Sequence, residues 1–173
     1  MRAQKLGLNA FVAETDEALN KELHEVLQLV ETDMTIFYRL LADVDILSQS
    51  LTDKELMAPL MPAYYAADAI TKDEKKRICN WLRQYQQRAQ QDDLSNDVRR
   101  KKMNAVNPKY VLRNYMAQLA IDDAEQSDFT LVNELLELLR HPYDEQKDKE
   151  HFAAKRPDWA RQRAGCSMLS CSS

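Results

Sequence analysis

The stretch Asn107-Pro108-Lys109-Tyr110-Val111-Leu112-Arg113-Asn114-Tyr115 reads as the sharp start of a buried helix. Its first residue can accept a hydrogen bond from a backbone N–H, and proline suits the first helical turn, where its missing N–H and fixed φ have no cost. Apolar residues then recur at helical spacing: Leu112, Tyr115, Met116 and Leu119. We therefore expect a helix from Asn107 to about Glu125, with this apolar face buried.

Helix start signals recur along the rest of the chain. The stretches Thr52-Asp53-Lys54-Glu55 and Thr71-Lys72-Asp73-Glu74 have the capping-box pattern, in which the first and last side chains bond each other's backbone N–H. Four more helices are expected to begin directly after a residue that can cap them: Thr15, Asp33, Ser95 and Asp128. Because Pro59 and Pro62 cannot both lie inside a helix, we expect a break or kink before Tyr64.

Composition and pattern favour an all-α fold. The 173 residues include only 2 glycines and 5 prolines, and 45% are hydrophobic, which is enough for a folded domain with a real core. The sequence contains no repeat of fixed period and no clear alternating strand pattern. We expect an irregular multi-helix domain over residues 1–141, in which residues 1–13 form a connector, and an extended, polar C-terminal tail over residues 142–173.

The charge pattern excludes some classes of protein. The net charge of −4 combines a basic middle, with 10 basic and 5 acidic side chains in residues 69–102, and an acidic excess on either side. A mildly acidic chain is not typical of a dedicated nucleic-acid-binding protein, so we expect no nucleic-acid partner. No stretch approaches the ~20 apolar residues that cross a bilayer, and no signal-like apolar block follows Met1. We therefore expect a soluble cytoplasmic protein with no membrane partner.

Several short motifs share one resemblance. The Asn107–Tyr115 run, Pro142-Tyr143-Asp144-Glu145, Pro157-Asp158-Trp159 and the terminal Ser170-Cys171-Ser172-Ser173 resemble the C-terminal part of the selenoprotein O family, the YdiU-type proteins. Weaker matches precede them in the right order: Lys5-Leu6-Gly7-Leu8, Asp33-Met34-Thr35-Ile36-Phe37-Tyr38-Arg39 and Trp81 to Arg88. The resemblance covers nearly the whole chain. It implies a protein adenylyltransferase of kinase-like fold, of which this chain looks like the last third.

The functional residues of that family do not transfer onto this chain. ATP and Mg²⁺ are the cofactors that the resemblance implies, but their residues belong to the kinase-like core, upstream of the matching part. Gly7 and Gly165 are isolated, so the sequence has no glycine loop that could cradle a phosphate. The nearest imitation of a kinase metal motif is Asp128-Phe129-Thr130, which we interpret as a helix cap. We expect no catalytic, cofactor-binding or metal residue here, and no ATP binding or AMP transfer by this chain alone.

The three cysteines are the most suggestive residues. Cys79 lies among apolar residues and reads as a small buried hydrophobe. Cys166 and Cys171 lie in the polar tail, where we expect exposed thiols that can oxidise. In the resembled family the position that matches Cys171 is selenocysteine in many animal members, and redox pairing with a cysteine of the kinase-like core is implied. Within this chain Cys166 is the nearby candidate for a redox partner, and an inert tail thiol is the alternative.

Two further clusters have ordinary alternatives that we favour. Cys166 and Cys171 with His141 and His151 would supply four zinc ligands, but their spacing is not that of known zinc sites. The basic run Arg99-Arg100-Lys101-Lys102 could contact phosphates or an acidic partner, and we interpret it as a solvated helix face.

Two functions from different classes follow. The first is the C-terminal helical part of a protein adenylyltransferase, which supports the missing kinase-like core, with Arg113 suited to bridge to it, and carries a redox-sensitive tail. The other partners are then the protein substrates of the whole enzyme, and the isolated chain is expected to expose an apolar patch through which a homodimer can form. The alternative is a stand-alone helical protein-interaction domain without catalysis, whose apolar faces are closed.

Overall fold

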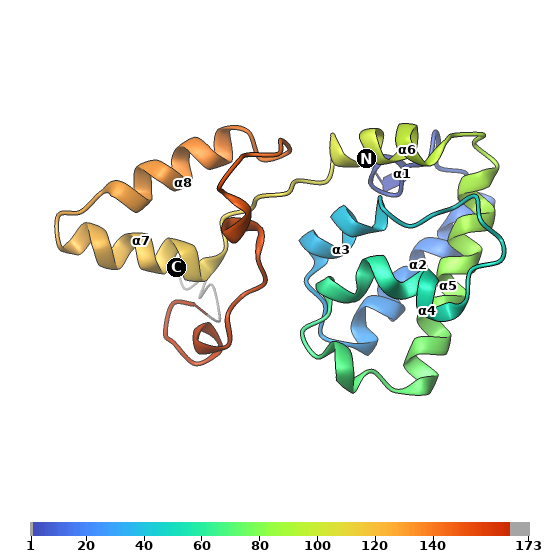
Figure 1. Ribbon diagram of the computed structural model, residues 1–173, viewed down its shortest axis with the longest axis horizontal. Coiled ribbons are helices and arrows are strands. Elements are labelled where there is room, and N and C mark those ends of the chain that lie inside the picture. The colour runs from blue at the N-terminus through green and yellow to red at the C-terminus, as the bar shows by residue number, and fades with distance from the viewer. Residues whose placement is uncertain (1, 167–173) are drawn as a thin grey trace. The chain divides into compact units, whose positions relative to one another are not determined.

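Residues 2–166 are described by the computed structural model, and their regular secondary structure is helical (Figure 1). Apart from one antiparallel bridge between Thr32 and Tyr64, this part of the chain contains no β-structure. The prediction of an all-α fold is therefore confirmed. None of the helices in this range combines the length and the apolar content that crossing a membrane requires.

Helix packing has to supply the core, because no sheet organises the described chain. The α-helices follow one another as α1 (Arg2–Lys5), α2 (Ala13–Leu29), α3 (Met34–Leu41), α4 (Asp53–Met57), α5 (Lys72–Gln90), α6 (Asn96–Asn104), α7 (Asn114–Glu125) and α8 (Thr130–Arg140). Short 3₁₀ helices lie between and after them: η1 (Ala58–Ala63), η2 (Ala67–Ala69), η3 (Glu150–Ala153) and η4 (Asp158–Arg161).

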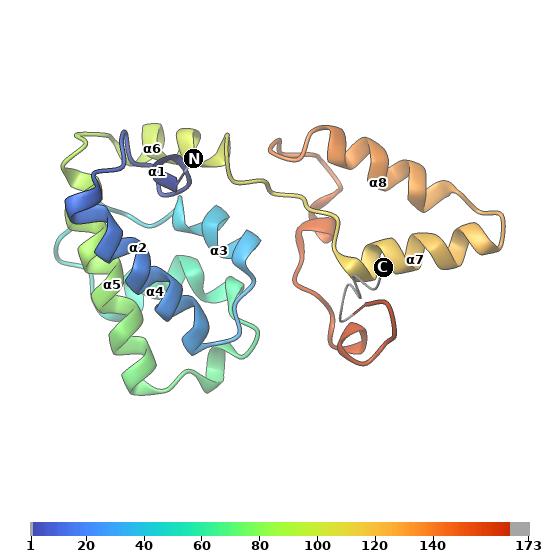
Figure 2. The ribbon, with the colours of Figure 1, turned by 180° about the vertical axis from the view of Figure 1, so that it is seen from behind.

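The chain divides into two compact units, Met1–Asn107 (unit 1) and Pro108–Ser173 (unit 2). Unit 1 contains α1 to α6, and unit 2 contains α7, α8 and the segment that follows them (Figure 2). This division differs from the boundary between residues 141 and 142 that we expected. The segment after α8 packs on the helices that precede it, since Phe152 and Ala160 belong to the buried apolar cluster of α7 and α8.

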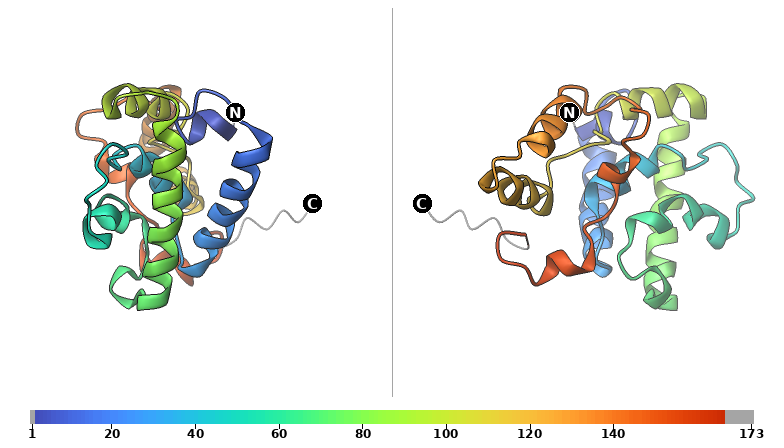
Figure 3. Two further views of the ribbon diagram at one scale, coloured as in Figure 1. Left: turned by 90° about the vertical axis from the view of Figure 1, so that its right-hand side faces the viewer. Right: turned by 60° about the vertical axis from the view of Figure 1, so that its left-hand side comes forward.

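The long helix α5 runs through the middle of unit 1, with α2 on one side and α4 on the other (Figure 3, left panel). Trp81 and Tyr85 of α5 are fully buried, and their rings stack with centroids 5.4 Å apart. The indole Nε1 of Trp81 donates a hydrogen bond to the carbonyl of Leu19 on α2 at 3.0 Å. Aromatic side chains of α5 thus position α2 by packing and by hydrogen bonding.

Local start signals in unit 1 are well predicted. Four expected helix starts are confirmed, each by a side-chain oxygen that accepts the backbone N–H three residues later: Asp33, Thr52, Thr71 and Ser95. Both capping boxes are complete, and the 3₁₀ helix η1 is the break expected from Pro59 and Pro62. Helix α2 begins slightly earlier than expected, at Ala13, because the carboxylate of Asp16 accepts the N–H of Val12 at 2.8 Å.

Residues 2–13 are more than the connector that we expected, because several of their side chains are buried. Leu6 and Leu8 are buried in the apolar core of unit 1. Gly7 has a φ of +70°, and a Cβ on it would lie only 2.7 Å from Cγ of Arg99 on α6. The positive φ and the close approach both require glycine at this position. The N-terminal residues therefore belong to the packed body of unit 1.

A buried ion pair ties the start of α2 to α5, and its guanidinium also holds the N-terminal arm. The guanidinium of Arg88 donates from Nε and Nη2 to the two carboxylate oxygens of Asp16, at 2.6 and 3.1 Å, and from Nη2 to the carbonyl of Ala10 at 3.0 Å. Burial by itself raises the pKa of Asp16, but the hydrogen bonds from Arg88 and from the N–H of Val12 outweigh it and lower the pKa below its ordinary value. The pair therefore holds a charged carboxylate inside the unit.

In unit 2 the helix start that we expected at Asn107 is wrong. Helix α7 begins at Asn114 and ends at Glu125, so only its end was predicted well. Tyr115 and Met116 are buried as expected, whereas Leu112 is 53% exposed.

Tertiary hydrogen bonds explain the late start of α7. The side-chain Nδ2 of Asn107 donates to the carbonyl of Lys5 at 2.9 Å, so this residue does not cap a helix. The backbone N–H groups of Lys109 and Tyr110 both donate to the carbonyl of Pro142, at 2.8 and 3.0 Å. These bonds hold the segment before α7 outside the helix and satisfy N–H groups that a helix start would leave without partners.

The second helix of unit 2 has a side-chain hydrogen-bonding residue at each end. At the start, the N-cap position is one residue later than expected, at Phe129, and Asp128 before it accepts the N–H of Thr130 with Oδ1 at 2.9 Å. At the end, the side-chain Nε2 of Gln146 donates to the carbonyls of Leu138 and His141, each at 2.9 Å. These bonds satisfy backbone groups that the helix itself leaves unpaired.

Candidate functional site

The cysteines are distributed differently from our expectation. Cys79 on α5 is buried as predicted, and burial raises the pKa of its thiol to about 11. Cys166 was expected to be exposed, but it is 2% exposed and lies in the apolar cluster of unit 2. Gly165, with a φ of +78°, precedes it and packs against Gln118 of α7. Cys171 lies outside the described residues, so the redox pairing of Cys171 with Cys166 stays a prediction.

The residues that imitate a kinase metal motif have a structural role. Asp128 lies directly before Phe129, the N-cap residue of α8, and hydrogen bonds from Thr130 lower the pKa of its carboxyl. Within residues 2–166, no group of three or more histidine, cysteine or acidic side chains could hold a metal ion, which includes the neighbourhoods of His141 and His151. The two glycines lie in tight turns against side chains. In this range, no cluster of acidic side chains fits Mg²⁺, and neither glycine lies in a loop that could cradle a phosphate.

The basic run of α6 is only partly a solvated face. Arg100, Lys101 and Lys102 are exposed, as expected, but Arg99 is fully buried. The relevant sequence signal is its spacing of four residues from Met103, which is buried on the same side of the helix.

Arg99 instead holds the coil that follows α3. Its Nη1 donates to the carbonyl of Leu41 at 3.2 Å, and its Nη2 donates to the carbonyls of Ala42, at 3.0 Å, and Val44. Nη1 also donates to the hydroxyl of Tyr85 at 2.8 Å. A fully buried charge is tolerated here because it is surrounded by hydrogen-bond acceptors.

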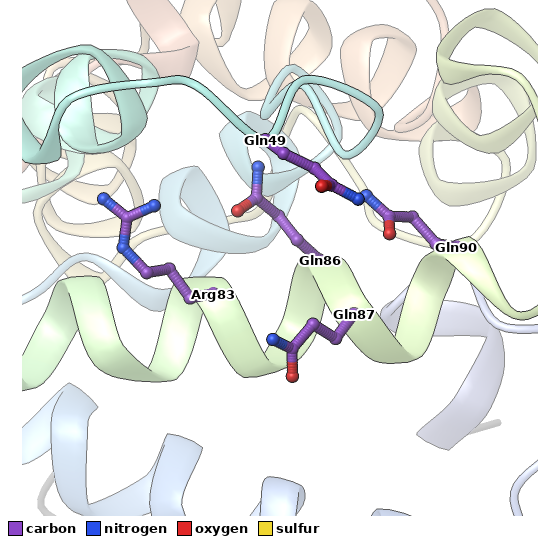
Figure 4. A pocket seen from close by; sticks show the side chains of 5 residues that line it. All are labelled: Gln49, Arg83, Gln86, Gln87 and Gln90. Carbon is purple, nitrogen blue, oxygen red and sulfur yellow. The ribbon is translucent and has the colours of Figure 1, made fainter.

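A polar hollow of about 260 Å³ lies next to the same coil and is lined by Arg83 and four glutamines (Figure 4). Gln86 and Gln90 point from α5 toward the loop that carries Gln49, whereas Gln87 points away from it (Figure 4). The amide of Gln86 donates to the carbonyls of Asp45, at 2.7 Å, and Ser48. The amide of Gln90 donates to the carbonyl of Ile46. These donors are already used to hold the coil, so we assign this hollow a structural role.

A second hollow in unit 1 has a different character. It is a partly open hollow of about 470 Å³ between α4, η1 and the start of α5, and we call it the methionine groove. It is lined by Asp53, Lys54, Met57, Ala58, Met61 and Lys75. Its surface is mainly apolar, with charged side chains as the remaining lining residues. Apolar hollows with a few polar groups are typical of binding sites.

The chain has extensive similarity to known proteins. A family model described as Protein adenylyltransferase SelO matches residues 1–140. Relatives named Protein nucleotidyltransferase YdiU from Rhodopirellula baltica, Aromatoleum aromaticum and Flavobacterium johnsoniae are 52%, 51% and 47% identical to it. Each match covers 100% of this chain but only 33%, 32% and 32% of the respective relative. The chain thus spans about a third of the length of these curated relatives.

Proposed function

Since the chain belongs to the protein adenylyltransferase SelO family, we propose that it is the helical C-terminal part of an enzyme that transfers AMP from ATP to protein hydroxyl groups. In this proposal the ATP and Mg²⁺ sites lie in an upstream kinase-like core, and the present chain supports that core. The proteins that receive AMP are substrates of the whole enzyme. A cytoplasmic location, expected from the sequence, is part of the same proposal.

The main support for this packing role is an exposed apolar stripe on α8. Leu135 and Leu138 point into the core of unit 2, yet Phe129, Val132 and Leu136 are 39–56% exposed. Phe129 is the N-cap residue of α8, and the spacing of three and four residues places these three side chains on one stripe beside the buried face. Apolar surface that extends this far beyond the buried face of a helix is normally covered by a partner.

The distribution of exposed side chains points the same way. Of the 11 large hydrophobic residues that are exposed in the described chain, seven lie in unit 2: Leu112, Ile121, Phe129, Val132, Leu136, Tyr143 and Trp159. Because the curated relatives are about three times as long, we infer that the upstream part of the enzyme covers this surface. Arg113, at the start of α7, is the residue for which we keep a bridging role to that part.

Reconstitution tests the proposal. The chain is mixed with the separately expressed upstream two thirds of one of these relatives, and complex formation is measured by size-exclusion chromatography with light scattering. Transfer of AMP is measured with labelled ATP and Mg²⁺. We expect the chain alone to transfer no AMP, and the two parts to form a stable complex that labels protein hydroxyls more strongly than the upstream part alone.

Matched variants locate the contact. Leu136→Glu on the exposed stripe is expected to prevent complex formation, whereas Glu137→Gln, on the next residue, leaves it intact. Circular dichroism should show both variants folded, because neither side chain is part of the buried core. If the two parts do not associate and the chain is a monomer, the stand-alone interaction domain becomes the better description. A homodimer that forms through the stripe would instead show that a second copy of the chain covers this surface.

The redox function belongs to the same proposal. We assign it to Cys171, on the basis of the family resemblance. Burial makes Cys166 a poor partner for thiol exchange, so a cysteine of the upstream core is the better candidate. Non-reducing mass spectrometry of the reconstituted complex identifies the partner directly. Recovery of Cys171 only as a free thiol under oxidising conditions would contradict this role.

A further inference from the structure

The floor of the methionine groove is apolar and adaptable. Met57 is 4% exposed and closes the bottom, while Met61 and Ala58 line the walls from η1. Methionine side chains are unbranched and polarizable, so they fit apolar partners of different shapes. A volume of about 470 Å³ lies within the ~300–1,000 Å³ that is typical of ligand pockets. The groove therefore has room for an apolar group from outside the chain.

The rim of the methionine groove is positively charged. Its one carboxylate, on Asp53, is already paired with Arg83 at 2.6 Å. Lys54 on α4 and Lys75 on α5 form no ion pair with any residue in the described part of the chain. The two ammonium groups thus reach the groove from two different helices. A partner is expected to bring more than one carboxylate to this rim.

The walls of the methionine groove are fixed before any partner arrives. The capping boxes at Thr52 and Thr71 anchor the first turns of α4 and α5, where the two lysines lie. The thiol of Cys79 contacts the carbonyl of Asp53 at 3.6 Å and joins the two helices behind the groove. A preformed groove avoids the entropy that ordering a flexible site would cost.

We propose that the methionine groove binds an acidic peptide segment of another protein, with an apolar side chain seated on the methionines and carboxylates near Lys54 and Lys75. An apolar anchor explains the floor, and flanking carboxylates explain the two cations. A single-headed amphiphile such as a fatty acid offers one carboxylate and leaves the second lysine without a partner. The proposal is independent of the AMP-transfer function, because the groove lies in unit 1 and the stripe of α8 lies in unit 2.

Fluorescence polarization with labelled peptides tests this proposal. The probe is fluorescein-Glu-Glu-Leu-Phe-Glu-Glu, and the two control peptides replace Leu-Phe by Ser-Ser or every Glu by Lys. We expect only the probe to bind the chain, and its affinity to fall as NaCl is added, because exposed charges are screened by salt. Dodecanoate is the competitor that represents a lipid-like ligand.

Protein variants locate the bound probe. Lys75→Glu removes one attraction and adds one repulsion at the rim, so we expect it to weaken binding about fivefold. Lys76→Glu changes the same charge on the neighbouring exposed residue, outside the groove, and should have no effect. Ala58→Glu places a carboxylate over the floor and should weaken binding by about tenfold or more. All three positions are exposed, so the variants are expected to fold like the native chain.

Three results would overturn the proposal. The first is equal binding to the Lys75→Glu, Lys76→Glu and Ala58→Glu variants, since it would place the peptide elsewhere. The second is binding of dodecanoate without binding of the probe, which would make the groove a lipid-like site. The third is loss of probe binding when the upstream part of a relative is added, because the groove would then be an internal contact of the longer enzyme.

Discussion

Replacement of Arg99 by methionine is the sharpest test of how unit 1 is held together. The variant Arg99→Met keeps the length and most of the volume of the side chain but removes all its donors. Three buried carbonyls, of Leu41, Ala42 and Val44, then lose the partner that the guanidinium provides. The hydroxyl of Tyr85 loses a donor as well.

The size of the effect follows from these contacts. A buried acceptor left without its hydrogen bond costs at least about 1 kcal/mol, so three carbonyls amount to about 3 kcal/mol. Removing a buried charge returns part of its desolvation free energy, while the lost contact with Tyr85 adds a further cost. We therefore expect the free energy of unfolding of unit 1 to fall by about 3 kcal/mol, a large share of the ~5–15 kcal/mol that stabilises an ordinary domain.

Tryptophan fluorescence measures this effect for unit 1 alone. The chain has two tryptophans, Trp81 in unit 1 and Trp159 in unit 2, so a Trp159→Phe background leaves one reporter, stacked on Tyr85. In urea, with an m-value of about 1.5 kcal/mol/M, the midpoint is expected to fall by about 2 M. Arg100→Met is the matched control, because its side chain is 50% exposed and its ion pair with Asp97 contributes less than about 1 kcal/mol.

Equal midpoint shifts in the Arg99→Met and Arg100→Met variants would refute the reasoning. A shift near zero in Arg99→Met would show that the carbonyls of the coil find water or other donors at no cost. A lower m-value together with a lower midpoint would instead indicate that the coil is already released in the folded state.

Three more outcomes follow from the contacts described above. Asp16→Asn is expected to destabilise unit 1 by about 3 kcal/mol at neutral pH, because it leaves Arg88 buried without its anion. The pKa of Asp16 is lower in the folded chain, so its contribution to stability is present above about pH 4 and is lost as the pH falls through the folded pKa. Urea midpoints measured from pH 7 downward should therefore drop more steeply for the native chain than for Asp16→Asn. Parallel curves would contradict this. A Cys171→Ser variant leaves two thiols, Cys79 and Cys166, and both are buried. At a pH well below the Cys79 pKa of about 11, Ellman's reagent should label them slowly in the folded chain and rapidly in concentrated urea. Equal labelling rates would show that neither thiol is protected. Gly7→Ala adds the cost of a positive φ, about 1 kcal/mol, to a Cβ contact of 2.7 Å with Arg99. The Trp81 fluorescence assay should therefore show that the free energy of unfolding of unit 1 falls by about 2–3 kcal/mol. An unchanged midpoint would mean that the N-terminal arm can move aside.

Helix starts in unit 1 could be predicted because each signal is local. The capping boxes at Thr52 and Thr71 need only a side chain and a backbone N–H three residues apart, and both formed as expected. The helix start predicted at Asn107-Pro108 was wrong because the same residues suit a turn as well as a helix start, and contacts with distant residues determine which one forms. The side-chain amide of Asn107 donates to the carbonyl of Lys5 and so does not cap a helix. The residue before a proline is also biased away from helical backbone.

The burial of single residues was harder to predict. In the run from Arg99 to Lys102, the only local signal for the buried arginine is its spacing of four residues from Met103, and its burial depends on acceptors such as the carbonyl of Leu41, 58 positions upstream. Cys166 has polar neighbours in sequence, yet the turn at Gly165 brings it into an apolar cluster. The methionine groove could not be predicted at all, because its lining comes from three helices whose packing fixes the hollow.

The coil between α3 and α4 is shaped by residues far from it in sequence. Gln86, Gln90 and Arg99 contact its main-chain carbonyls, and these donors lie 38 to 58 positions downstream of the residues they hold. Every residue type carries the same carbonyl, so exposed coil positions such as Leu47 can change their side chain without changing the contacts that fix the path of the backbone. The sequence of the coil can therefore change while its backbone keeps the same path, because the side chains that fix this path belong to α5 and α6.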